Sequence, residues 1–275
     1  MTRYAKLHGN GNDFLVLDLR GTPGEGKDHA AEARALCRRE ESLGADGLLL
    51  VESSSRLNFR MRLFNRDGSE GEMCGNGARC IARYAWETGI APAEMAFETL
   101  GGDVHARVDA PFVRLRLAEV DLGDATWERK ASAGGQVLAY SFLTVGVPHC
   151  VVFLDDLATR PREELFRLGR ELRRRTDLFP RGTNVNFLAP EKEGLFLITY
   201  ERGVEDLTRS CGTGSVASAV TARRLGRCGD DVKVRNLGGI NRVLLEDSGL
   251  DRVRPSLEGR TALVAWMEPT EEALV

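Results

Sequence analysis

The sequence lacks a long apolar run and an excess of charge of either sign. No stretch approaches the ~20 consecutive apolar residues of a membrane-spanning helix, and the first residues contain no apolar segment of signal-peptide length. The 38 lysines and arginines nearly balance the 41 aspartates and glutamates, which leaves a formal net charge of −3. We therefore expect a cytoplasmic protein that binds neither membrane nor nucleic acid.

Paired cysteine motifs are missing as well. The six cysteines include no Cys-x-x-Cys spacing, which argues against a structural zinc site. Cytoplasmic thiols stay reduced, so we do not expect a disulfide framework. Gly9-Asn10-Gly11 precedes a predicted strand, whereas the glycine loop of a dinucleotide site follows one. The sequence therefore predicts no metal site, and it contains no nucleotide-binding motif.

What the sequence does contain is an internal repeat. Cys74-Gly75-Asn76-Gly77 matches Cys211-Gly212-Thr213-Gly214 at an offset of 137 residues, half the length of the 275-residue chain. The same offset aligns Leu100-Gly101-Gly102 with Leu237-Gly238-Gly239. Several matches in the same order at one offset indicate duplication of a unit about half the chain long.

The predicted secondary structure repeats in the same way. The first half predicts strand 14–17, helix 28–41, strands 47–52 and 59–64, and helix 78–88; the second predicts strand 151–154, helix 162–175, strands 184–188 and 195–200, and helix 215–225. We expect two pseudo-symmetric α/β (α+β) domains, each a mostly antiparallel sheet or barrel around a central helix. The active site would lie in the cleft between them. The first domain would comprise 1–118 with 262–275, whose strand returns to it, and the second 119–261.

The repeated cysteines occupy positions where a reactive thiol can form. Adjacent glycines let the backbone approach a ligand closely. The unpaired N–H groups and the dipole at a helix start favour an anion. Such a position can hold a carboxylate and shift a nearby thiol toward the reactive thiolate. We therefore single out Cys74 and Cys211 as functional, and we expect the other four cysteines to be small buried hydrophobic residues.

Two thiols from two similar domains suit the inversion of a carbon centre. A base must remove a proton from one face while an acid delivers a proton to the other, and a thiolate and a thiol can exchange these roles in the reverse direction. The intermediate carries carbanion charge, partly on its carboxylate, which two helix N-termini would stabilise. The pattern predicts a racemase or epimerase whose partner is a small amino-acid substrate.

Longer motifs around these positions resemble the diaminopimelate epimerase family. In chain order they are residues 6–14 (KLHGNGNDF), 64–70 (FNRDGSE), 73–80 (MCGNGARC), 146–149 (GVPH), 200–205 (YERGVE) and 210–214 (SCGTG). They extend across essentially the whole chain. The resemblance implies an isomerase that converts LL-2,6-diaminopimelate to meso-diaminopimelate, for lysine and peptidoglycan synthesis, and that uses no cofactor, neither pyridoxal phosphate nor a metal.

The resemblance also implies roles for individual residues. Cys74 and Cys211 match the acid/base pair, and His149 and Glu201 lie where the family tunes the thiols. The backbone donors to the reacting carboxylate correspond to Gly75, Asn76, Gly212 and Thr213. Substrate-binding side chains, several at the distal end, correspond to Asn12, Asn65, Asn184, Glu201 and Arg202.

The distal assignment also has a physical argument. A substrate with a second amino-acid head needs a cation for its carboxylate and an anion for its ammonium, and Glu201-Arg202 supplies both. Without the resemblance, such a pair is more often solvated at the surface. The chain departs from the family at Gly47 and Val147, where some members place Gln and Asn against the substrate, and at Leu207, where Glu is usual.

Two other functions stay open at the level of sequence. A related two-cysteine racemase, of the histidine type, would act on a single-headed amino acid, but Glu201-Arg202 and Asn184 would then lack partners. A thiol redox sensor would form a reversible disulfide without turnover. The sequence does not give the oligomeric state, so a homodimer stays open too.

Overall fold

The computed structural model describes residues 2–21 and 27–274. The chain divides into two compact units, which we call unit 1 (Met1–Arg116 with Gly259–Val275) and unit 2 (Leu117–Glu258). The division falls after residues 116 and 258, whereas the sequence places it after 118 and 261. Within the described ranges, none of the helices has both the length and the apolar character that crossing a membrane requires.

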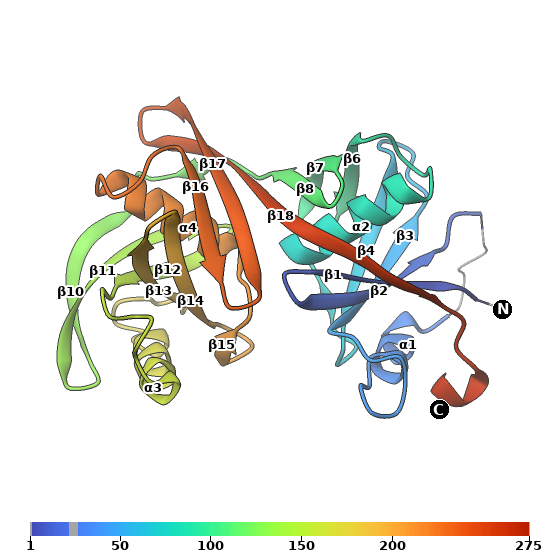
Figure 1. Ribbon diagram of the computed structural model, residues 1–275, viewed down its shortest axis with the longest axis horizontal. Coiled ribbons are helices and arrows are strands. Elements are labelled where there is room, and N and C mark those ends of the chain that lie inside the picture. Colours follow the sequence, from blue (N-terminus) through green and yellow to red (C-terminus); the bar gives the residue numbers. More distant parts are fainter. Residues whose placement is uncertain (1, 22–26, 275) are drawn as a thin grey trace. The chain divides into compact units, whose positions relative to one another are not determined.

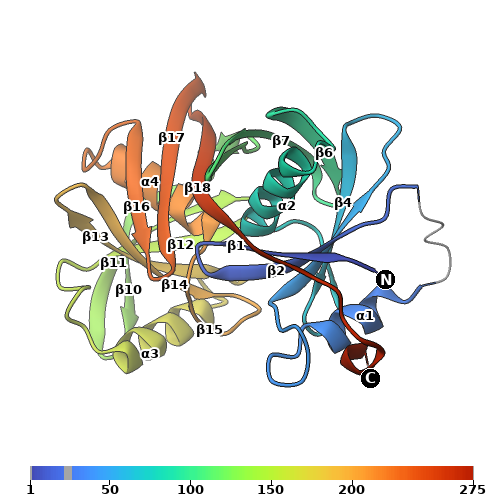
Figure 2. The same ribbon diagram turned by 45° about the vertical axis from the view of Figure 1, so that its right-hand side comes forward.

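Unit 1 is a ring of strands around one helix. Its strands are β1 (Tyr4–Gly9), β2 (Asn12–Asp18), β3 (Gly47–Glu52), β4 (Phe59–Asn65), β5 (Glu70–Gly71), β6 (Glu94–Thr99), β7 (Gly102–Asp109) and β8 (Phe112–Arg116). They pair antiparallel, except that β2–β3 and β4–β6 are parallel. The long strand β18 (Arg252–Met267) pairs with β1 and β8 and so closes the ring. Helix α2 (Gly75–Glu87) contacts strands on several sides (Figures 1 and 2), and α1 (His29–Leu36) packs on β4 and the final 3-10 helix, Glu271–Leu274.

Unit 2 repeats this connectivity. Its strands are β9 (Val120–Asp121), β10 (Thr126–Ala133), β11 (Gln136–Val145), β12 (Val147–Phe153), β13 (Asn184–Glu191), β14 (Gly194–Glu201), β15 (Asp206–Thr208), β16 (Asp231–Asn236) and β17 (Gly239–Gly249). Here β12–β13 and β14–β16 are the parallel pairs. Its helices are α3 (Arg162–Arg173) and α4 (Gly212–Arg224). An offset of 137 residues places α2 on α4 and β6 on β16 residue for residue, so the predicted duplication and fold class are confirmed.

Helix α4 is built mostly from small residues that tolerate burial. In α4 the nine buried residues 214–222 are glycine, alanine, serine, valine and threonine. Small side chains let the surrounding strands approach the helix closely. The hydroxyl of Ser215 donates to the Cys211 carbonyl and that of Thr221 to the Ala217 carbonyl, both at 2.8 Å. These bonds satisfy polar atoms that would otherwise be costly to bury.

Several predicted boundaries are wrong. Helix α1 ends at Leu36 rather than at residue 41, because the chain turns back and the N–H of Gly44 donates to the Leu36 carbonyl at 2.9 Å. Arg39, in that turn, pairs with Asp13 instead of continuing the helix. The predicted helices 78–88 and 215–225 begin three residues too late, because the glycines after each cysteine already belong to the helix.

The strand predictions missed the first strands of each unit. The first strands predicted for the two halves are 14–17 and 151–154. They fall within β2 and at the end of β12. The structure places β1 before β2, and β10 and β11 before β12. Strand β1 includes Lys6 and His8, and β10 includes four exposed residues, 128–130 and 132. Their apolar alternation is therefore weak in the sequence.

Helix α3 packs on unit 2 through a close contact at Gly169. A Cβ atom at this position would lie 2.5 Å from Cβ of Tyr200 and 2.7 Å from its Cγ. We expect Gly169→Ala to lower the free energy of unfolding by roughly 1–3 kcal/mol, because the helix and β14 must separate to make room. Urea denaturation measures this. Arg167→Ala, at an exposed position of the same helix, is the control, and equal stability of the two variants would contradict the prediction.

Candidate active site

Cys74 occupies the residue before α2 in an extended backbone conformation and is partly exposed. Its Sγ lies 3.7 Å from Oδ1 of Asn12, to which it donates, and the same oxygen accepts from Nδ2 of Asn76 at 3.3 Å. The first-turn N–H groups of α2, including those of Gly75 and Asn76, begin beside the thiol, where a helix favours negative charge. The predicted residues Asn12, Cys74, Gly75 and Asn76 thus come together in unit 1.

The orientation of the Asn12 amide is set by Asp46, which the sequence analysis did not identify. Nδ2 of Asn12 donates to Oδ2 of Asp46 at 2.8 Å, so its oxygen faces Cys74. Arg39 bonds both Asp46 and Asp13, and Lys6 pairs with Asp13 at 2.6 Å. These cations hold the pKa of Asp13 down at about 2, although burial opposes that shift. A carboxylate accepts only, so this network fixes which end of the amide meets the thiol.

Cys211 occupies the matching residue before α4 and is buried, with 6% of its surface exposed. Its Sγ accepts from the N–H of Gly214 at 3.3 Å and lies 3.6 Å from the Thr213 hydroxyl. Its own N–H donates to Asn236 at 3.4 Å. A donor to sulfur favours the thiolate over the thiol. The two thiols therefore differ: Sγ of Cys74 faces an acceptor, and Sγ of Cys211 faces a donor.

A buried polar cluster lies beneath Cys211. Nδ2 of Asn186 donates to the Cys150 carbonyl at 3.2 Å and meets Nδ1 of His149 at 3.1 Å, while its Oδ1 accepts from the Thr199 hydroxyl at 3.0 Å. A Cβ atom on Gly214 would lie 2.5 Å from that Oδ1 and 3.1 Å from Sγ of Cys211. The thiol, the helix start and the cluster are thus closely packed. Asn186 and Thr199 carry no recognisable motif, and the sequence analysis missed them.

His149 is fully buried and neutral. Burial lowers its pKa to about 3, the positive charge of Arg202 adds to this, and the bond to Asn186 opposes it. Because Nδ2 of Asn186 is a donor, Nδ1 of His149 accepts and its proton resides on Nε2. Burial also raises the pKa of Glu201, and Thr208 opposes that shift. Burial therefore acts on both groups predicted to tune the thiol: it keeps fully buried His149 neutral, and it raises the pKa of half-buried Glu201.

The burial of neutral His149 makes stability depend on pH. In the unfolded chain this group binds a proton near pH 6.5 and in the folded chain only near pH 3. Between these values the unfolded state binds the extra proton, so the free energy of unfolding falls as pH falls, by at most about 1.4 kcal/mol per pH unit.

We expect His149→Gln to show a weaker loss of stability than the unaltered protein between pH 6.5 and 4. Urea denaturation at several pH values tests this. His105→Gln, at an exposed position of β7, is the control. Equal pH slopes in both variants would mean that His149 does not carry the dependence.

The remaining predicted residues lie on β13, on β4 and in the turn that follows β14. Asn184 is buried and pairs with His149 in the parallel ladder, and its Oδ1 accepts from the Arg202 N–H at 2.8 Å. The guanidinium of Arg202 donates to the Arg181 carbonyl at 2.6 Å. Asn65 is exposed and its Nδ2 donates to Ser69 at 3.0 Å. The structure thus groups Asn184 with Arg202 and His149, whereas the Asn65 amide bonds Ser69 in the turn after β4.

The departures from the family motifs have local explanations. A Cβ atom on Gly47 would lie 2.7 Å from the Phe64 carbonyl oxygen, so this backbone leaves no room for a polar side chain there. Leu207 is 6% exposed and belongs to the apolar core of unit 2. Val147 begins β12, opposite Val145.

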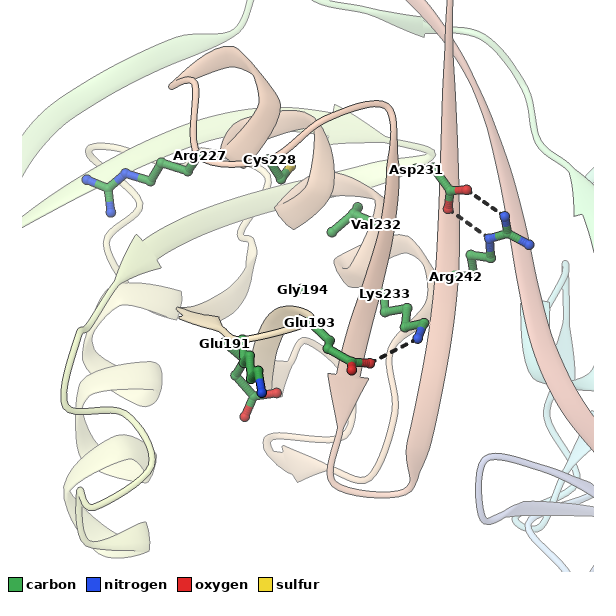
Figure 3. A pocket seen from close by; sticks show the side chains of 10 residues that line it. Glu191, Glu193, Gly194, Arg227, Cys228, Asp231, Val232, Lys233 and Arg242 are labelled. Carbon is green, nitrogen blue, oxygen red and sulfur yellow. Dashed lines mark hydrogen bonds and ion pairs between the residues drawn. The ribbon is translucent and has the colours of Figure 1, made fainter.

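A pocket in unit 2 lies away from these residues. It has a volume of about 560 Å³ and is lined by 191–194, 227–228, 231–233 and 242, none of which is a predicted site residue. Figure 3 shows its charges pairing with each other, Lys233 with Glu193 and Arg242 with Asp231. The described part of the chain contains no group of three His, Cys, Asp or Glu side chains placed to hold a metal ion.

Comparisons with known proteins identify relatives across most of the chain. A family model described as "Diaminopimelate epimerase" matches residues 4–128 and 141–256. The diaminopimelate epimerase of Methanocella arvoryzae is 40% identical over 250 residues, 86% of this chain and 87% of the relative. That of Methanothrix thermoacetophila is 41% identical over 253 residues, 87% and 88% of the two chains.

Solved structures share the fold. A hydroxyproline epimerase from Agrobacterium vitis matches with a TM-score of 0.71 and 20% identity, over 97% of this chain and 91% of that one. A phenazine biosynthesis protein of the PhzF family from Bacillus anthracis matches with a TM-score of 0.70 and 15% identity, over 97% and 99%. At these identities the similarity concerns the fold alone.

Proposed function

The chain belongs to the diaminopimelate epimerase family, and on that premise we propose that it converts LL-2,6-diaminopimelate to meso-diaminopimelate with Cys74 and Cys211 as acid and base. The observation that carries the proposal is the repeated cysteine. Each of the two residues directly precedes a central helix. The thiol of each makes a polar contact, Cys74 with the Asn12 side chain and Cys211 with the Gly214 N–H. Chance burial of unreactive cysteines does not account for two such matched positions.

The reaction is an inversion at one α-carbon of the substrate. One cysteine, as thiolate, takes the α-hydrogen as a proton from one face, and the other, as thiol, donates a proton to the opposite face. In the reverse direction the two exchange roles. The first-turn N–H groups of α2 and α4 would bind the reacting carboxylate and stabilise the charge that develops on it. Because the thiols supply both proton transfers, the mechanism assigns no step to a cofactor.

The distal half of the substrate carries a second ammonium and carboxylate. We assign the carboxylate to the guanidinium of Arg202 and the ammonium to Glu201, with Asn184 holding the Arg202 backbone in place. Asn12 and Asn65 would add hydrogen bonds to the substrate. The support for this assignment is that the backbone N–H of half-buried Arg202 bonds the buried Asn184 amide at 2.8 Å, which places Arg202 beside the buried residues of the site.

The test is exchange of the α-hydrogen in heavy water. Incubation with LL-diaminopimelate should give the meso isomer with deuterium at the inverted carbon, detected by chiral chromatography and mass spectrometry. L-Histidine and trans-4-hydroxy-L-proline are the comparison substrates. Exchange on either of these, without exchange on diaminopimelate, would reject the proposed substrate and leave the two-thiol chemistry in place.

A further inference from the structure

Arg79, in the second turn of α2, is fully buried and incompletely paired. Its Nη2 donates to Oδ1 of Asn76, whereas its Nε and Nη1 have no hydrogen-bond partner among the described residues. Burial lowers the pKa of Arg79, and interactions with the Cys80 and Cys74 thiols oppose that shift. A buried guanidinium with unsatisfied donors is costly to stability. Its presence therefore needs a reason other than packing.

The surrounding backbone fits this guanidinium closely. A Cβ atom on Gly259, in β18, would lie 2.8 Å from Nε of Arg79 and 2.9 Å from its Cζ. A Cβ atom on Gly9, at the end of β1, would lie 3.6 Å from Nη2. β1 and β18 pair with each other here, Gly9 opposite Thr261. Two glycine-bearing strands thus hold the guanidinium in one place.

Arg79 begins a chain of hydrogen bonds that leads to Cys74. The chain runs from Nη2 of Arg79 to Asn76, from Nδ2 of Asn76 to Asn12, and from Nδ2 of Asn12 to Asp46. A guanidinium only donates and a carboxylate only accepts, so the two ends fix the direction of both amides between them. Sγ of Cys74 meets the oxygen of Asn12 at 3.7 Å within this chain. Asp46 already sets the direction of the Asn12 amide, so Arg79 orients the Asn76 amide, and what it adds at the thiol itself is its charge.

Arg79 has no charged counterpart at the matching position of unit 2. The offset of 137 residues places Val216 of α4 on Arg79 of α2, and Val216 belongs to the apolar core of unit 2. The fold therefore does not require a cation at this position. Polar support at the start of α4 comes from neutral groups, with Asn236 and Asn241 both donating to the Ser215 hydroxyl.

We propose that Arg79 is a positioning residue for Cys74, whose charge favours the Cys74 thiolate and whose donor orients the Asn76 amide. The proposal deepens the function proposed above and rests on it for the role of the thiolate. Arg79 follows Cys74 by five residues, and a charge in a dry interior acts over a longer range than the same charge in water. A full charge thus stabilises the thiolate form of Cys74, whereas a backbone N–H donor stabilises that of Cys211.

The charged carboxylates near the start of α2 are paired with other cations. On β1 and β2, Lys6 pairs with Asp13, which also binds Arg39, and the turn before β3 supplies Asp46 to the same network. His8 completes the ionisable groups of β1 near this end. On β7 and β8 the residues at alternate positions facing α2 are buried and apolar, and charged side chains alternate outward. Cys80, on α2 itself, is fully buried, and burial raises its pKa.

The test is the pH dependence of thiol alkylation, which requires no substrate. Full-length protein is treated with iodoacetamide, and the rate at Cys74 is measured from pH 5.5 to 9.5 by peptide mass spectrometry. In Arg79→Met we expect the midpoint for Cys74 to rise by roughly one pH unit, so that alkylation at pH 7 slows about tenfold. The rates at Cys211 and at partly exposed Cys228 should not change, and they serve as internal controls.

Three further variants separate electrostatics from a loss of fold. Arg79→Lys keeps the charge and should keep the midpoint close to that of the unaltered protein. Gly259→Ala displaces the guanidinium and should move the midpoint in the direction of Arg79→Met by a smaller amount. Arg83→Met removes a cation that pairs with Glu87 one turn later in α2 and should leave Cys74 unchanged.

The stability of the Arg79→Met variant is measured as well, because it shows whether a change at Cys74 comes from a loss of fold. Methionine removes an incompletely paired buried charge, so Arg79→Met should unfold at the same or a higher urea concentration than the unaltered protein. An unshifted Cys74 midpoint in folded Arg79→Met and in Gly259→Ala would overturn the proposal. If Arg79→Met does not fold, an unshifted midpoint in Gly259→Ala overturns it alone. Failure of the proposed function would instead appear as absent hydrogen exchange in the unaltered protein.

Discussion

Replacing either repeated cysteine by alanine should reduce epimerisation of diaminopimelate by about a hundredfold to ten-thousandfold. Inversion needs a base on one face and an acid on the other, and a positioned acid or base contributes about 10²–10⁴ in rate. Removing both should cost little more than removing one, because the pair acts as a unit. Cys228→Ala removes a thiol that bonds the Ala219 carbonyl and is the matched control.

Serine variants separate the two faces. A hydroxyl is a far weaker acid than a thiol, so it is a poor base at neutral pH. Each Cys→Ser variant should keep a trace of α-hydrogen exchange only with the stereoisomer whose proton faces the surviving thiolate, and the two variants should prefer opposite isomers. Deuterium incorporation into LL- and meso-diaminopimelate measures this. If Cys211→Ala epimerises at the unaltered rate, the two-thiol mechanism is wrong.

Arg202→Met should lower kcat/KM for diaminopimelate by about 30-fold to several thousandfold. Losing one charged partner in a desolvated site costs roughly 2–5 kcal/mol, and the distal carboxylate would lose its bidentate donor. The proton transfer itself should survive, so exchange at saturating substrate should fall less than kcat/KM. Steady-state kinetics at pH 7.5 with the LL isomer measures both parameters.

The control for this variant is Arg181→Met. The Arg202 guanidinium bonds the backbone carbonyl of Arg181, not its side chain, and Arg181 itself is exposed. That variant should therefore keep kcat/KM within about twofold, as surface changes usually do. If Arg202→Met turns over diaminopimelate as well as the control does, the distal assignment is wrong and a single-headed substrate gains support.

The repeat determined most of what could be predicted about the architecture. One offset between Cys74 and Cys211 also aligns the two central helices and strands β6 and β16. The apolar periodicity within each half predicted the ends of helices and strands less well. The helix starts at Gly75 and Gly212 were missed because glycine disfavours helix interiors, and only the extended backbone of the preceding cysteine reveals a helix start there.

The sequence by itself determined the two cysteines, their glycines and the duplicated order of elements, because these are local patterns that recur at a fixed spacing. Only the tertiary structure decided which side chains support each thiol. Asp46, Arg79, Asn186 and Thr199 act through bonds to residues 3 to 37 positions away. Whether an asparagine presents its oxygen or its nitrogen depends on what lies at its other end. That polarity is a property of the folded network, and no local pattern in the chain encodes it.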